Sequence, residues 1–381
     1  MTEATEIHPL SNEAFLAFFR RVPKEDWLVI GWAMGLKILL FVLGAKALMI
    51  FDDKKVKGLH ASLELWNRWD SLHYLQVAEI GYKKGPHLVV HPVFPWLVRA
   101  FAFVTGDYFV GALFVSTVSL VAVVVLFRRL LQLDYSALVA QRAIWFLLIF
   151  PTAYFLQIGY TESLFLAFVL GAMLAARQDC WWLAGLLGAL AAMTRANGIA
   201  LAPVLAVEVC QQFFVGRKWR WPWLWIGLIP VGYSVYLLIN LNVGGSLFAF
   251  VETRRQIFCA SPAWPWVGIV DAIHNLRRQP NQAEMVGAQE LYFVALTFVC
   301  AIVSWLKLRP VYAAWITINW IGFASQSFIQ SAPRYTLVCF PIFILFALLG
   351  HNRFWFGLIS AWSLLFFTLF AILFARGWWA F

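Results

Sequence analysis

Residues 66–82 bring together side chains suited to acid–base chemistry. In a helix of about 3.6 residues per turn, their spacing places a carboxylate, an imidazole and a phenol within about a third of the circumference. The polar face consists of Asn67, Asp70, His73 and Tyr74, with Arg68 and several leucines opposite. Tryptophans next to the acid are typical of a helix at the boundary between water and lipid. We therefore predict a reactive helical face at a membrane surface.

The composition predicts the scaffold that holds this face. Hydrophobic residues make up 62% of the 381-residue chain and charged residues 13%, which is too little polar surface for a soluble domain. The apolar runs lack the alternation of a β-barrel and so indicate membrane-spanning helices. The net charge of +10 comes from short basic clusters between these runs, which are topology signals and not a nucleic-acid surface. We predict an all-α, polytopic membrane protein that contacts membrane lipids and no nucleic acid.

The apolar runs predict about eleven transmembrane helices in a single domain of residues 1–381. They cover residues 27–50, 107–127, 138–157, 160–177, 180–194, 198–214, 221–242, 289–306, 311–330, 336–350 and 354–375. Arg20, Arg21 and Lys24 hold the N-terminus in the cytoplasm, so the first span is an uncleaved anchor. Every short cytoplasmic turn is then basic. The five cysteines show neither metal-ligand spacing nor a disulfide framework.

Residues 51–106 form the first external loop in this topology, with amphipathic helices that carry Asp70. Within it, residues 91–105 are open to two interpretations: a further span, which would reverse the topology downstream, or a juxtamembrane helix on the outer leaflet. Pro92 and Pro95 break regular helix here. We prefer the juxtamembrane helix, because the next apolar run then ends with its two arginines inside.

Four polar clusters meet at the outer face in this arrangement. They are Asp70 with His73, residues 160–163, residues 194–198 and residues 331–335. Convergent polar groups on an apolar scaffold are what a ligand pocket needs.

Three residues of the first span and the first external loop each have more than one interpretation. Asp70 is either a general base that takes the proton from an attacking hydroxyl, or an interfacial carboxylate paired with Arg68 or a lysine. His73 orients Asp70 or contacts a phosphate. The alternative is a histidine at the membrane interface whose hydrogen bonds are already made and which has no functional role. Lys37, inside the first span, is either a substrate contact or a residue packed in the bundle.

The other clusters supply a second acid and two arginines. Glu162 either caps the following helix or binds an acceptor sugar or a divalent cation. Arg195 lies in an apolar region where it needs a partner or a watery cavity, and Asn197 permits irregular backbone there. Arg334 follows a proline at a helix start and forms either an anion site or an inter-helix salt bridge. Acids and arginines together suit a lipid-borne sugar phosphate, because the arginines hold the phosphate while an acid deprotonates an alcohol. No metal site is predicted, and no cofactor beyond the possible divalent cation.

At these residues the sequence resembles the PIG-V-like mannosyltransferases of the GT-C superfamily of membrane glycosyltransferases. The motifs are Arg68-Trp69-Asp70-Ser71-Leu72-His73-Tyr74, Ala78-Glu79-Ile80-Gly81-Tyr82, Pro92-Val93-Phe94-Pro95, Phe150-Pro151-Thr152-Ala153, Gly159-Tyr160-Thr161-Glu162-Ser163, Thr194-Arg195-Ala196-Asn197-Gly198 and Pro333-Arg334-Tyr335. Each motif alone is weak, whereas their order over residues 60–350 is specific.

The resemblance implies a GT-C-like fold and an inverting enzyme. Its reaction moves a hexose, usually mannose, from a polyprenyl- or dolichyl-phosphate carrier to a lipid-linked or glycan acceptor on the external or lumenal face. Asp70, in the first external loop, is then the carboxylate of interest and acts as the general base. The residues expected to bind substrate are Arg68, His73, Tyr74, His91, Tyr160, Glu162, Arg195, Asn197, Arg334 and Tyr335. His91 departs from the family, which tends to place an aromatic residue there.

Compact loops in a short chain favour a bacterial cell membrane over the endoplasmic reticulum. The alternatives to an enzyme are a lipid or sugar-lipid transporter and a non-catalytic membrane subunit.

Overall fold

The computed structural model describes residues 23–216, 218–278 and 287–380. Helices make up most of this part, and its β contact is an isolated bridge between Pro262 and Gln326. The all-α prediction is therefore confirmed. Arg20 and Arg21, on which the predicted orientation partly depends, lie outside the described residues.

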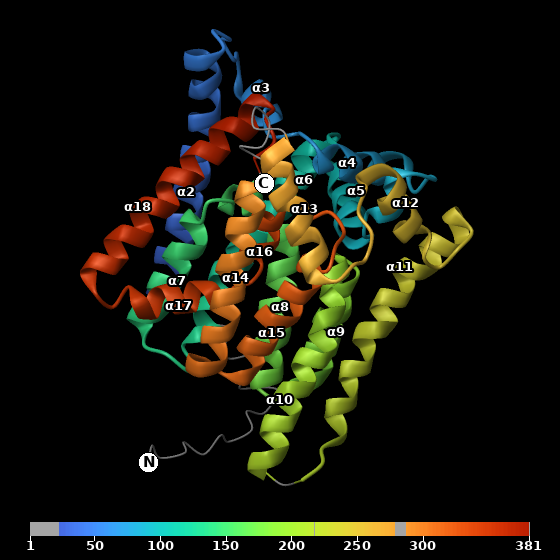
Figure 1. Cartoon of the computed structure of the whole chain (residues 1–381), viewed down its shortest axis with the longest axis vertical. Helices are drawn as coiled ribbons and strands as arrows, with labels where there is room; N and C mark the ends of the chain where they lie inside the picture. Colours follow the sequence, from blue (N-terminus) through green and yellow to red (C-terminus); the bar gives the residue numbers. More distant parts are fainter. Residues whose placement is uncertain (1–22, 217, 279–286, 381) are drawn as a thin grey trace.

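The helices follow one another in a long bundle (Figure 1). The α-helices are α2 (Lys24–Phe51), α3 (Leu59–Glu64), α4 (Asp70–Ile80), α5 (Val93–Thr105), α6 (Tyr108–Leu131), α7 (Ala137–Ile149), α8 (Glu162–Arg177), α9 (Trp181–Ala192), α10 (Leu201–Gly216), α11 (Leu228–Gly244), α12 (Ala249–Phe258), α13 (Pro265–Arg278), α14 (Ala288–Lys307), α15 (Pro310–Ala324), α16 (Ala332–Leu337), α17 (Pro341–Leu349) and α18 (Arg353–Arg376). Four 3₁₀ helices are η1 (Pro86–Val89), η2 (Ala153–Leu156), η3 (Ala196–Ala200) and η4 (Trp221–Gly227).

Six helical segments in the described part are long and apolar enough to cross a membrane. They are α2, α6, η3 with α10, η4 with α11, α14 and α18. Each coincides with a predicted span, so the polytopic membrane class is confirmed. The count of eleven is not confirmed, because the other predicted spans correspond to shorter helices.

Prolines explain two of these shortfalls. The predicted span 138–157 ends early, because α7 stops at Ile149 and the chain turns at Phe150-Pro151. The predicted span 336–350 is divided between α16 and α17, and Pro341 starts the second of these helices. Proline has no backbone N–H to donate and clashes with the preceding turn, so it starts helices and does not continue them.

The predicted external loop contains α3, α4, η1 and α5. Helix α4 begins at Asp70, because Trp69 adopts a left-handed φ of 55° that ends any helix before it. The prediction that Asn67 shares a helical face with Asp70 is therefore wrong. Helix α5 has 13 residues, fewer than the roughly 20 that cross a bilayer.

The buried helix α8 runs through the centre of the bundle and packs against α6 and α9. Its first residue is Glu162 and its last is Arg177. At a rise of about 1.5 Å per residue, these two charged residues lie roughly 23 Å apart. In Figure 1, α4, α5 and α12 lie in the upper right part of the view, and the end of α10 lies at the bottom.

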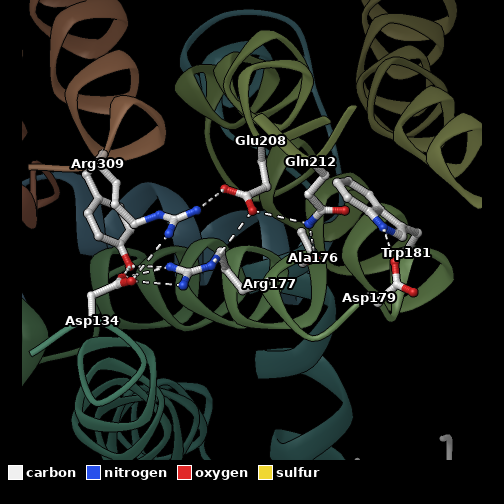
Figure 2. Close-up of polar contacts among 9 residues, drawn as sticks. Asp134, Ala176, Arg177, Asp179, Trp181, Glu208, Gln212 and Arg309 are labelled. Atoms are coloured by element: carbon white, nitrogen blue, oxygen red, sulfur yellow. Dashed lines mark hydrogen bonds and ion pairs between the residues drawn. The ribbon is translucent and has the colours of Figure 1, made fainter. Parts of the chain in front are cut away.

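A charged cluster surrounds the C-terminal end of α8, as Figure 2 shows. Arg177 donates to Asp134 at 2.7 Å, and Arg309 lies 3.5 Å from the same carboxylate. Glu208 on α10 lies 3.4 Å from Arg309 and 3.8 Å from Arg177. Both arginines belong to turns predicted to be cytoplasmic, so the structure places these turns at one end of the bundle.

Another buried ion-pair group joins α2 to α6. The carboxylate of Asp26 is fully buried and lies 2.5 Å from Arg128 and 2.9 Å from Arg129. The two arginines, which the sequence predicts as a topology signal, therefore also hold the first helix to the bundle.

We expect Asp26→Asn to destabilise the protein, because it leaves two buried guanidinium groups without a counter-charge. Removing one partner of a buried ion pair costs about 3–5 kcal/mol. Thermal unfolding of the detergent-solubilised protein measures this effect. Glu25→Gln, at the exposed neighbouring position, is the matched control. Equal melting temperatures for the two variants would contradict the prediction.

Candidate active site

Glu162, the first residue of α8, is the buried centre of the site. Its Oε1 accepts hydrogen bonds from Nη1 of Arg195 and from Nε of Arg334. Nη1 of Arg195 also donates to the hydroxyl of Thr161 at 3.0 Å. The carboxylate therefore holds two arginines that come from elements far apart in the chain.

Asp70 joins this network through Arg334. Nη1 of Arg334 lies 2.5 Å from Oδ2 of Asp70, and Nη2 donates to the hydroxyl of Tyr74 at 3.0 Å. The guanidinium thus bridges the carboxylates of Asp70 and Glu162. A planar guanidinium carries several donors in a fixed fork, which suits it to such a bridge.

The two acids differ in accessibility. The side chain of Asp70 is 36% exposed, whereas that of Glu162 is 0% exposed. Arg334 between them is 5% exposed. Asp70 is therefore the acid of the network that a substrate can reach.

Local backbone features position Arg334. It lies on the short helix α16, which follows Ser331 in a left-handed conformation with φ of 62°. The backbone N–H of Ser331 donates to Oε1 of the buried Glu290 at 3.0 Å. Glu290 was not among the predicted site residues; an acid at the start of an apolar run was the signal for it.

Aromatic rings surround the two arginines. The guanidinium of Arg334 lies 4.8 Å from the ring centre of Tyr160, and that of Arg195 lies 5.5 Å from Tyr335. The hydroxyl of Tyr160 donates to the backbone carbonyl of Arg68 at 2.7 Å. Cation–π contacts stabilise desolvated guanidinium groups. Burial raises the pKa of Tyr74 to about 12, so its phenol is neutral near pH 7.

Four predicted substrate contacts lie outside this network. Arg68 donates to the carbonyls of Leu65 and Ala375, each at 2.9 Å, and so anchors the end of α18. Asn197 donates to Asn319 at 2.8 Å. Asn319 was missed in the sequence, because a lone asparagine inside an apolar run has no distinguishing pattern.

The remaining two are histidines with unused ring nitrogens. Nδ1 of His73 and Nε2 of His91 are buried and have no hydrogen-bond partner among the described residues. His91 stacks on Tyr236 with ring centres 3.8 Å apart. Burial, together with the charge of Arg195, lowers the pKa of His91 to about 3, so the ring is neutral near pH 7.

The described residues contain no group of three or more His, Cys, Asp or Glu side chains placed to hold a metal ion. Glu162 was one candidate ligand for a divalent cation. In the structure its Oε1 accepts hydrogen bonds from two guanidinium groups.

The fold and the site define a polytopic helical membrane protein with an acid–arginine network at one end of its bundle. Residues 53–219 match the family model described as Mannosyltransferase (PIG-V). The predicted resemblance to PIG-V-like mannosyltransferases is therefore confirmed, and the matched segment contains Asp70, Glu162 and Arg195. Arg334 lies beyond it.

Curated relatives agree with this match. The mouse protein named GPI alpha-1,6-mannosyltransferase 2 is 31% identical over 231 residues, which cover 55% of this chain and 43% of the relative. The human protein of the same name is 28% identical over 180 residues, covering 43% of this chain and 35% of the relative. The similarity thus spans less than half of the length of either relative.

Structural alignment with the crystal structure of the Archaeoglobus fulgidus oligosaccharyltransferase in the apo form covers 92% of this chain and 56% of that chain. The TM-score is 0.44 and the sequence identity is 11%.

We expect Glu162→Gln to lower the melting temperature strongly, because both arginines then lose their buried counter-charge. The cost of such a loss is about 3–5 kcal/mol. Glu64→Gln is the control, since the Glu64 side chain is 55% exposed. A melting curve for Glu162→Gln that matches this control would show that the network contributes little to the fold.

Proposed function

We propose that this protein is a membrane mannosyltransferase in which Asp70 is the general base. The observation that carries the proposal is the contrast in exposure between Asp70 and the buried partners that fix it. A base needs access to the substrate and a fixed position, and Asp70 has both. The match to the PIG-V family favours a transferase over the transporter and the non-catalytic subunit.

The reaction we propose is a single inverting displacement. The acceptor hydroxyl attacks C1 of the sugar as its proton passes to the carboxylate of Asp70. The bond between C1 and the phosphate oxygen breaks, and the carrier leaves as a lipid phosphate. Because phosphate is a competent leaving group once its charge is met by cations, no nucleotide is required.

Arg334 and Glu162 act mainly on Asp70 in this proposal. The sequence suggested that Arg195 and Arg334 hold the donor phosphate. In the structure both guanidinium groups pair with Glu162, and Arg334 also pairs with Asp70. We therefore assign to Arg334 the positioning of the Asp70 carboxylate, and to Glu162 the positioning of both arginines.

The substrates are part of the same proposal. The donor is a polyprenyl- or dolichyl-phosphate mannose, and the acceptor is a lipid-linked sugar or glycan on the external or lumenal side. GPI appears in the names of the mouse and human relatives, and the acceptor proposed for this chain is not restricted to it. A bacterial cell membrane stays the predicted location.

We expect Asp70→Asn to lower kcat by about 10²–10⁴-fold, the usual contribution of a general base. The assay follows transfer of labelled mannose from a polyprenyl-phosphate donor, with products identified by mass. Asp53→Asn, at an exposed acid of the same external segment, is the matched control and should keep wild-type turnover. Near-wild-type turnover by a folded Asp70→Asn protein would remove Asp70 from the role of base.

A further inference from the structure

The network around Glu162 is electrically balanced, which bears on where a donor phosphate binds. It contains two carboxylates and two guanidinium groups, joined by ion pairs from Asp70 to Arg334, from Arg334 to Glu162 and from Glu162 to Arg195. The guanidinium of Arg68 donates to backbone carbonyls instead. A lipid-linked sugar phosphate carries negative charge before and after transfer, so its binding calls for a cation beyond this balanced set.

Helix α12 presents such a cation. The side chain of Arg254 makes no hydrogen bond or ion pair with any described residue. It lies one turn after Phe250, and residues four apart share a helix face. Phe250 packs on Tyr236 with ring centres 5.3 Å apart, and Tyr236 stacks on His91 at 3.8 Å. Arg254 is therefore on the face of α12 that packs on Tyr236, and Tyr236 in turn stacks on His91.

The loop that carries His91 in turn borders the site. The backbone N–H of Val93 donates to the carbonyl of Met193 at 3.2 Å, which joins this loop to the one that carries Arg195. Besides burial, the charges of both Arg195 and Arg254 act to lower the pKa of His91, so the ring lies within electrostatic range of the two guanidinium groups. The segment around His91 thus contacts the loop of Arg195 through Val93, and η1, just before His91, packs against α12.

His91 also has an unused hydrogen-bonding atom. Its side chain is largely buried, with the residue 7% exposed, and Nε2 has no partner among the described residues. A buried polar atom without a partner is uncommon in a folded protein and is often a position that a ligand or water completes.

We propose that Arg254 binds the phosphate of the lipid-linked sugar donor, and that Nε2 of His91 accepts a hydrogen bond from a sugar hydroxyl of the same donor. The inference rests on the proposed function, because it names the residues that hold the donor of that reaction. Arg254 then meets the charge of the phosphate from outside the balanced network, leaving Arg334 to hold Asp70.

The test compares Arg254→Gln with Arg255→Gln in the purified full-length protein. Arg255 is the matched control, because it is exposed on the same helix and pairs with Glu252 at 3.0 Å. We expect Arg254→Gln to raise the KM for polyprenyl-phosphate mannose roughly 10- to 100-fold, the value of one charge-assisted hydrogen bond. Arg255→Gln should leave it unchanged, and Arg254→Lys should restore part of the affinity.

A binding measurement separates this inference from the proposed function. Polyprenyl phosphate without sugar should bind the wild-type protein and Arg255→Gln alike, and Arg254→Gln more weakly; inorganic phosphate is the second probe. If wild-type protein transfers mannose while Arg254→Gln keeps its donor KM, the inference is overturned and the proposed function stands. If transfer is absent but Arg254→Gln weakens lipid-phosphate binding, the proposed function fails and the phosphate site stands. A KM change confined to the acceptor also overturns the assignment.

Discussion

The bridge that Arg334 makes between Asp70 and Glu162 is the interaction on which the site depends. It joins α16 to the starts of α4 and α8, elements far apart in the chain. Taking these charges out of water costs free energy that apolar side chains of similar volume would not. Compared with apolar side chains, the whole network therefore adds little net stability, although removing one of its members is costly. It is better explained as a means of fixing one accessible carboxylate. That explanation agrees with the exposure of Asp70 and the burial of its partners.

Helix α8 relates the site to the opposite end of the bundle. Glu162 starts the helix inside the network, and Arg177 ends it inside the cluster with Asp134 and Glu208 (Figure 2). Charged groups thus fix both ends of a helix whose sides are almost entirely apolar and buried. Because the interior between them is closely packed, the helix holds Glu162 in place as a rigid element.

Two features could be predicted from the sequence because they follow from simple constraints: the all-α membrane class, and the convergence of the polar clusters at one end of the bundle. Apolar runs must be helices in a bilayer. The loops that join successive spanning helices alternate between the two sides of the membrane, so every second loop lies at the same end of the bundle. Other features depend on contacts between residues that are distant in sequence. The pairing of Arg334 with Asp70 is one, and no local spacing contains it. The left-handed backbone at Trp69 is another, since it separates Asn67 from the face of α4 that a regular helix would have given it.

The arrangement of partners around Arg334 bears on how Asp70 can change its charge. When Asp70 accepts a proton, Arg334 loses one negative partner but keeps Glu162 and the hydroxyl of Tyr74. These two remaining partners hold the guanidinium in place while Asp70 is neutralised. The network, which was neutral before the step, then carries one net positive charge. The phosphate gains one negative charge as it leaves. Since opposite charges attract, proton transfer to Asp70 and departure of the phosphate would favour each other.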